Sequence, residues 1–132
     1  MTLGLVTGAL ADGLGLRRAM CAGLLILGGA SGLGALIRDP VGLLALRALE
    51  GMGFLLTTMP APGLIRRLVP EGRLSPMLGW WGAYMPLGTA VALLAGPVVL
   101  QAWGWAGLWL AMAVLSLGLI AGVLCFVPVD AA

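Results

Sequence analysis

The sequence predicts an all-α protein, a polytopic bundle of helices that cross a membrane. Hydrophobic residues make up 61% of its 132 positions and charged residues only 9%, and the mean hydropathy is +1.12. A water-soluble fold of this size could not bury so much apolar surface. Because the polar connections are too short for a soluble domain, residues 1–132 are expected to form a single transmembrane domain.

Four long apolar stretches and one short one are separated by Arg, Asp, Pro and Gly at similar intervals. The long stretches, which we expect to span the membrane, are residues 19–37, 41–65, 77–100 and 105–127. Residues 1–11 form a partial span, because a helix of that length extends about 16 Å against a hydrocarbon core of about 30 Å. Pro60 and Pro62 are expected to kink the second long span. Residues 66–76 are predicted to be the longest polar connection.

The distribution of Arg predicts how the chain lies in the membrane. One side carries five Arg residues, namely Arg17, Arg18, Arg66, Arg67 and Arg73, whereas Arg38 lies alone on the other. By the positive-inside rule the five-Arg side is cytoplasmic, and the C-terminus lies on that side. The Arg-rich, Lys-free composition, dominated by Ala, Gly and Leu, suggests a bacterial inner membrane.

The Trp residues fall near the expected membrane surfaces. Trp80 and Trp81 lie near the cytoplasmic end of their span, and Trp103, Trp105 and Trp109 gather at the opposite surface. An aromatic belt explains most of these Trp residues. Tyr84 follows Trp80 and Trp81 by one helical turn, so it faces either the lipid headgroups or a central cavity.

Several function classes are excluded by composition. The net charge of +2 is small and dispersed, so nucleic acid is not expected as a partner. Cys21 and Cys125 stand far apart and the chain has no His, so we expect no metal site, disulfide or cofactor. The run Gly28–Gly34 could be mistaken for the glycine-rich turn of a short-chain dehydrogenase, but it lies inside an unbroken apolar span. Such enzymes also use a Tyr and Lys pair, and this chain has no Lys. The protein is therefore not expected to be an enzyme, and the Gly28, Gly32 spacing instead favours close helix packing.

The run between the first two stretches combines an acid, glycines and two Arg residues: Gly8, Asp12, Gly15, Arg17 and Arg18. Asp12 can accept hydrogen bonds from a helix N-terminus or pair with Arg, and such contacts form in one conformation and break in another. The alternative is a positive-inside loop with a solvated acid.

Arg47 and Glu50 form the second polar group, and they lie three residues apart within a span. That spacing places them on one helix face. Ionisable residues inside a membrane usually line a bundle interior or a water-filled cavity. The alternatives are a mutual ion pair that makes burial tolerable, or an Arg47 that snorkels to the interface.

These motifs resemble those of the major facilitator superfamily. Residues 8–18 resemble the loop G-x-L-A-D-R-x-G-R-R/K between the second and third helices, with Gly13 and Leu16 in place of two basic residues. Residues 47–53 resemble the fourth-helix motif R-x-x-Q-G-x-G, with Glu50 in place of Gln. Gly96 and Pro97 resemble the fifth-helix G-P motif of family antiporters. Residues 81–88 and 104–109 also resemble the fifth and sixth helices of cyanate-permease-like members.

The resemblance implies part of the family's N-terminal half, from the end of helix two to the end of helix six. Helix one, most of helix two and the second six-helix half are expected to be missing. The function implied is secondary transport of a small solute, such as an organic anion, by alternating access. The expected partners are the lipid bilayer, a small-molecule substrate with proton coupling, and the missing transporter half or other helices.

The resemblance also implies roles for individual residues. Arg47 would attract an anionic substrate, Glu50 would take up a proton or tune Arg47, and Tyr84 is a further substrate candidate. The run from Gly8 to Arg18 would act as a conformational gating loop, and the Gly96–Pro97 pair would permit close packing and a bend. A small non-transporting membrane protein, or an assembly partner for other helices, is the alternative.

Overall fold

The computed structural model describes residues 15–127, and in this part of the chain every regular element is a helix. The predicted all-α class is therefore confirmed. The helices are α2 (Leu16–Gly34), α3 (Pro40–Thr58), α4 (Ala61–Leu68), α5 (Glu71–Gly82) and α6 (Tyr84–Phe126). Three stretches are long and apolar enough to cross a membrane, residues 16–34, 40–68 and 71–126.

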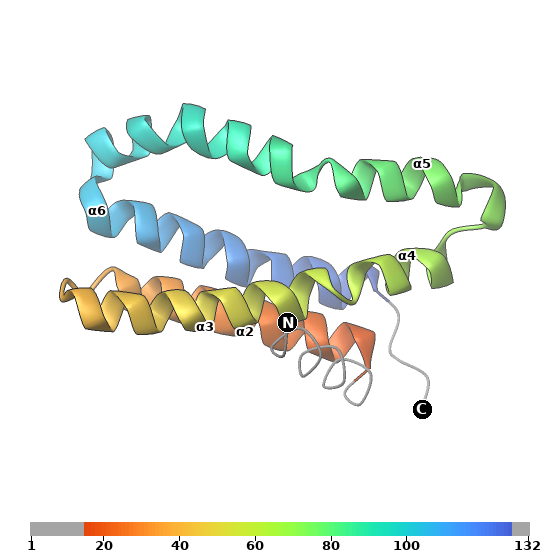
Figure 1. The fold of residues 1–132 in the computed structure, drawn as a ribbon, viewed down its shortest axis with the longest axis horizontal. Coiled ribbons are helices and arrows are strands. Elements are labelled where there is room, and N and C mark those ends of the chain that lie inside the picture. Colours follow the sequence, from red (N-terminus) through yellow and green to blue (C-terminus); the bar gives the residue numbers. More distant parts are fainter. Residues whose placement is uncertain (1–14, 128–132) are drawn as a thin grey trace.

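Helix α2 is the centre of the packed part of the molecule. It packs against α3 and against the later part of α6, whereas α5 and the earlier part of α6 run apart from these helices (Figure 1). The described residues thus form a packed layer, made of α2, α3 and residues 105–126, and an outer arm, made of residues 71–103. Most side chains in residues 84–103 are exposed, because no other described helix covers them.

The outer arm turns back on the packed layer at Gly104. This residue has φ 67° and ψ −169°, the non-helical conformation inside α6. A side chain would be strained there, and only glycine adopts this region readily. The turn lies within residues 101–104, so α6 holds two passes of opposite direction (Figure 1).

Short polar signals set the ends of α3. Asp39 is its N-cap, with an extended backbone and a carboxylate that accepts a 2.6 Å hydrogen bond from the Gly42 N–H. Pro40 follows at the first helical position, where the missing N–H costs nothing. The helical conformation is interrupted between Thr58 and Ala61, and Pro60 is the N-cap of α4. The helix end therefore falls where Pro60 and Pro62 were expected to kink the span.

Residues 66–76, predicted to be the longest polar connection, are largely helical. Arg66 and Arg67 form the last turn of α4, and Glu71 begins α5, so the connection narrows to Val69 and Pro70. Basic groups at a helix C-terminus and an acid at an N-terminus both complement the helix dipole, which explains why charged residues continue these helices.

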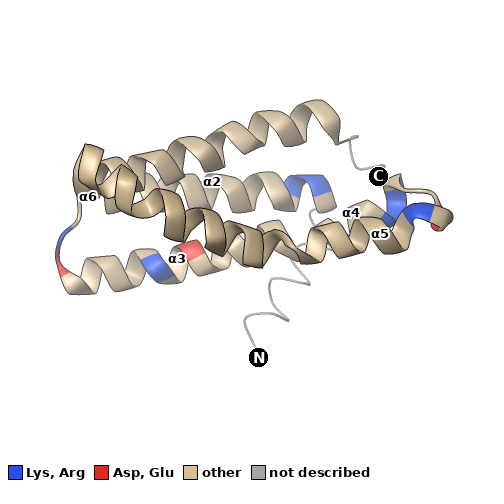
Figure 2. Ribbon diagram, turned by 90° about the horizontal axis from the view of Figure 1, so that it is seen from above, with Lys and Arg blue, Asp and Glu red and all other residues tan. Residues whose placement is uncertain are grey.

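The basic segments nevertheless gather at one end of the molecule. The start of α2 and the region around the α4–α5 connection lie at the same end, opposite the α2–α3 turn (Figure 2). Arg17 and Arg18 are part of the first turn of α2 rather than of the preceding loop, which begins the helix earlier than residue 19.

Glycines set the spacing between the packed helices. A Cβ on Gly23 would lie 2.6 Å from the Gly53 carbonyl oxygen, and a Cβ on Gly53 would lie 2.8 Å from that of Gly23. The two backbones of α2 and α3 therefore meet at this crossing, which the sequence analysis did not identify. Of the predicted packing pair, Gly28 lies in close contact, because a Cβ there would be 2.7 Å from Leu117 Cγ, whereas a Cβ at Gly32 would meet its nearest neighbour at 3.9 Å.

Candidate functional site

The candidate site is a polar cluster where side chains of α3 and α6 meet over α2. Arg47 Nη1 donates a 2.9 Å hydrogen bond to Glu50 Oε2 within an ion pair on α3. Ser31 Oγ on α2 donates a 2.7 Å hydrogen bond to the other carboxylate oxygen, Oε1. Trp109 on α6 lies beneath Arg47, with 4.7 Å from the guanidinium carbon to the ring centroid.

The two charged residues differ in their surroundings. Glu50 is buried, with 11% of its side chain exposed, whereas 65% of the Arg47 side chain is exposed. Both carboxylate oxygens of Glu50 accept a hydrogen bond, which compensates for the loss of solvent. The hydrogen bond from Arg47 to Glu50 uses one of the five N–H donors of the guanidinium. The arrangement combines a buried, hydrogen-bonded carboxylate with a largely exposed guanidinium.

Trp109 corrects an expectation from the sequence. It was assigned to an aromatic belt at the membrane surface, but it is buried, with 5% of its area exposed. Its ring lies against the backbone of Gly34, where a Cβ would overlap the indole. Because Gly34 has no side chain, the ring packs on α2 and presents a face to Arg47, a cation–π contact typically worth about 0.5 to 2 kcal/mol. Trp103, at 68% exposure, remains a surface residue.

Ser31 was not predicted as a site residue, because its neighbourhood in the sequence is a run of small residues typical of helix packing. The available signal was weak: Ser31 is the one Ser or Thr in residues 16–34. A buried hydroxyl in an apolar span needs a hydrogen-bond partner, and here that partner is the Glu50 carboxylate.

Two cavities adjoin the ion pair. The larger cavity has a volume of about 420 Å³, and its lining residues are Leu27, Ser31, Arg47, Glu50, Gly51, Phe54, Met112 and Ser116. The smaller cavity has about 110 Å³, and its lining residues are Ser31, Arg47, Glu50, Trp105, Leu108, Trp109 and Met112. Four residues, including the ion pair, line both cavities. Arg47 and Glu50 therefore lie between the smaller cavity, which is lined by Trp105, and the larger cavity, which is lined by Ser116. These two α6 residues are eleven positions apart, about 16 Å along a helix.

Tyr84 lies near the larger cavity without lining it. Its ring centroid is 6.3 Å from that of Phe54, which does line the cavity, and 5.3 Å from that of Trp81. The Phe54–Tyr84 contact joins the outer arm to α3.

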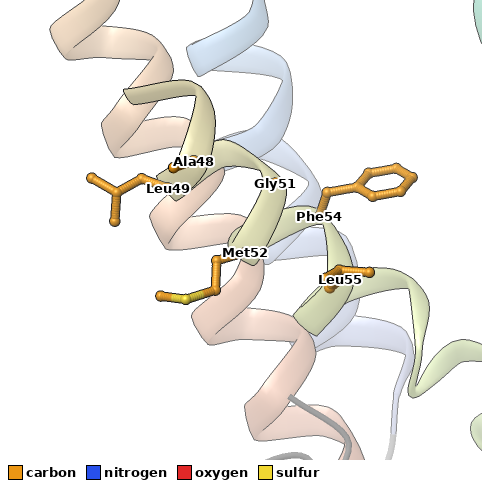
Figure 3. Close-up of a pocket in the computed structure, with 6 residues that line it drawn as sticks. All are labelled: Ala48, Leu49, Gly51, Met52, Phe54 and Leu55. Carbon is orange, nitrogen blue, oxygen red and sulfur yellow. The ribbon is translucent and has the colours of Figure 1, made fainter. Parts of the chain in front are cut away.

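A different, apolar groove lies along α3. Its volume is about 590 Å³, and its lining residues are Ala48, Leu49, Gly51, Met52, Phe54 and Leu55 (Figure 3). Leu49 and Met52 point away from Phe54 and Leu55, so the groove follows the helix surface (Figure 3). Its side chains carry no charge or hydroxyl, and it therefore offers no polar chemistry.

The structure describes residues 15–18 of the expected gating loop. Gly15 has φ 86°, a left-handed conformation that favours glycine just before α2. Arg17 Nη2 donates a 2.7 Å hydrogen bond to the carbonyl oxygen of Leu124. That carbonyl belongs to the last turn of α6, whose carbonyls lack helical partners, so the positive side chain caps the helix and complements its dipole. Gly8 and Asp12 lie outside the described residues.

The remaining predicted residues lie away from the ion pair. Gly96 and Pro97 fall inside the first pass of α6, and a Cβ at Gly96 would meet no atom within 4 Å among the described residues. The structure therefore joins Arg47 and Glu50 in one cluster, brings Tyr84 to its edge through Phe54, and leaves the helix-bend pair on the outer arm.

Comparison with known proteins gives the family. The profile described as Major Facilitator Superfamily matches residues 1–132. Searches of curated proteins and of solved structures found no match. The matched residues include the whole polar cluster and the apolar helices that carry it. The chain belongs to the major facilitator superfamily, which makes it an integral membrane protein of a transporter family rather than of an enzyme family.

Proposed function

We propose that this chain forms part of a secondary transporter that moves a small organic anion across the bilayer by alternating access. The observation that carries the proposal is the Arg47–Glu50 pair on the wall of a cavity of about 420 Å³ between apolar helices. A charge inside a membrane is costly and usually marks a solute or ion pathway.

The ion pair supplies a coupling step in the proposed cycle. While Glu50 is ionised, it holds the Arg47 guanidinium and offsets its charge. A proton taken up on the Glu50 carboxylate cancels that negative charge, and Arg47 can then bind the anion. Release of the anion and of the proton restores the pair. One proton and one monovalent anion therefore cross together, with no net charge moved.

The other predicted residues have supporting roles in this proposal. Tyr84 contacts Phe54 on the cavity wall, so movement of the outer arm would reach the cavity through that contact. Gly8, Asp12, Gly15, Arg17 and Arg18 would form the conformational gating loop. The hydrogen bond from Arg17 to Leu124 supports this role, because it ties the start of α2 to the end of α6. Gly96 and Pro97 would provide the bend of the outer arm.

The proposed transporter includes helices beyond those described. Family transporters bind their solute between two six-helix halves that move around a central site. We propose that this chain acts with such additional helices, in the same polypeptide or in other copies. The five-Arg end would lie in the cytoplasm of a bacterial cell, with the chain in the inner membrane and its C-terminus inside.

Uptake of a labelled organic anion into proteoliposomes tests the proposal. In the complete transporter, Arg47→Ala should abolish uptake, whereas Arg38→Ala, at an exposed position outside the cluster, should retain it. Unchanged uptake by a correctly folded Arg47→Ala variant would contradict the role of Arg47. Saturable uptake by the isolated chain would contradict the requirement for further helices.

A further inference from the structure

The cavities beside the ion pair indicate which anion the site accepts. We infer that the solute is an amphipathic monocarboxylate, with its carboxylate at Arg47 and a compact apolar body in the larger cavity. This inference rests on the proposed function, because it names the solute class for the same site.

The head group is determined by the geometry of Arg47. A guanidinium is a planar fork of five N–H donors, and its edges bind a carboxylate side-on. The Trp109 ring lies 4.7 Å from the guanidinium carbon, and the bond to Glu50 uses Nη1. The donors that remain lie in the plane, and Arg47 lines both cavities. A flat carboxylate fits this edge better than a bulky neutral group.

The body of the solute is determined by the side chains around the larger cavity. Leu27, Phe54 and Met112 line it from three different helices. Apart from the ion pair, the polar lining groups are the hydroxyls of Ser31 and Ser116, and Ser31 already donates to Glu50. A sugar would leave most of its hydroxyl groups without partners, at about 1 to 3 kcal/mol for each buried group.

The charge of the described lining disfavours a solute with two acidic groups. A dicarboxylate would place its second charge among Leu27, Phe54 and Met112, and Arg47 is the one cation among the described lining residues. One carboxylate with an apolar body matches both the single cation and the apolar side chains of this lining.

Three small probes separate the contributions of head and body. Benzoate has both parts, acetate has the carboxylate without the body, and benzamide has the body without the charge. Binding is measured by calorimetry on the purified Glu50→Gln chain in lipid nanodiscs, at a pH where both acids are ionised, because the Gln side chain represents the protonated carboxyl that the proposed cycle requires for anion binding. Benzoate should bind roughly tenfold or more tightly than either of the other two probes, a difference of about 1.4 kcal/mol. Equal binding of benzoate and acetate, or of benzoate and benzamide, would overturn the inference.

Two variants assign the probe preferences to residues. Arg47→Gln should remove the preference for benzoate over benzamide, whereas Arg38→Gln should retain it. Met112→Ala should reduce the preference for benzoate over acetate, whereas Met85→Ala, exposed on the outer arm, should not change it. A benzoate preference that survives both site variants would place the probe elsewhere and overturn the inference.

The same probes separate this inference from the proposed function. Benzoate binding with the expected preferences, but without Arg47-dependent anion uptake in the complete transporter, would support the solute class and overturn the transport proposal. Arg47-dependent uptake of acetate and benzoate at equal efficiency would support the transport proposal and overturn the solute class.

Discussion

Ser31 and Glu50 form a buried hydrogen bond of 2.7 Å between α2 and α3. It fixes one oxygen of the carboxylate, while Arg47 holds the other at 2.9 Å. The acid of the candidate site is therefore positioned by two helices, and its orientation depends on the packing of α2 against α3. This dependence makes the site sensitive to changes in residues that carry no charge.

Removal of the Ser31 hydroxyl should destabilise the protein. Ser31→Ala leaves Glu50 Oε1 without its donor, and an unsatisfied buried group costs about 1 to 3 kcal/mol. The free energy of unfolding in mixed micelles measures the effect. Ser75→Ala, at an exposed position of α5, is the matched control and should change it by less than about 0.5 kcal/mol. Equal effects of the two substitutions would show that the Ser31 bond contributes nothing specific.

Arg47 and Glu50 should be energetically coupled. Arg47→Ala removes one of the two partners of the buried acid and should cost about 1 to 3 kcal/mol. Glu50→Gln in the same chain removes the charge that needs compensation, so the double variant should be more stable than Arg47→Ala alone. A double-mutant cycle of unfolding free energies measures this coupling. Arg38→Ala with Glu71→Gln is the control pair, and additive effects at residues 47 and 50 would contradict the prediction.

Gly34 should be required for the position of Trp109. In Gly34→Ala the new Cβ overlaps the indole, so the ring must move away from α2 and from Arg47. We expect lower stability and a red-shifted Trp fluorescence, because the buried ring becomes exposed. Gly29→Ala on the same helix meets no atom within 4 Å among the described residues, and better helix propensity should make it neutral or slightly stabilising. An unchanged spectrum of Gly34→Ala would disagree with the packing of Trp109.

The crossing of α2 and α3 should tolerate no side chain at Gly53. Gly53→Ala places a Cβ 2.8 Å from the Gly23 carbonyl oxygen, so the helices must separate, at a typical cost of about 1 to 3 kcal/mol. Gly51→Ala, two residues earlier, has open space among the described residues and should retain the native unfolding free energy. Distance measurements between spin labels on α2 and α3 should report a wider separation in Gly53→Ala alone. Identical separations in the two variants would argue against a close crossing at this point.

Parts of the candidate site were predictable because they depend on local geometry. The three-residue spacing of Arg47 and Glu50 predicts a shared helix face, and the ion pair in the structure is one of the alternatives that this spacing allows. Asp39 followed by Pro40 similarly predicts the start of α3, because Asp is a favoured N-cap residue. Such features involve residues within one helical turn, so the order of residues is sufficient to predict them.

The partners contributed by other helices were not predictable in the same way. Ser31 lies 19 positions from Glu50, and Trp109 lies 62 positions from Arg47. In the sequence, Trp109 looks like the other Trp residues near the membrane surface. Its burial depends on the missing side chain of Gly34 on a different helix.

The all-α membrane class, the resemblance to the family and the shared helix face of Arg47 and Glu50 were predictable from the order of residues. These follow from apolar length, motif order and helical periodicity, which are local or additive properties of the chain. Only the packed structure shows that Ser31 and Trp109 complete the polar cluster, and that Gly23 and Gly53 form the crossing of α2 and α3. The physical reason is that helix packing is determined by close contact between side chains and backbones distant in sequence, and a single Cβ atom is enough to prevent such contact.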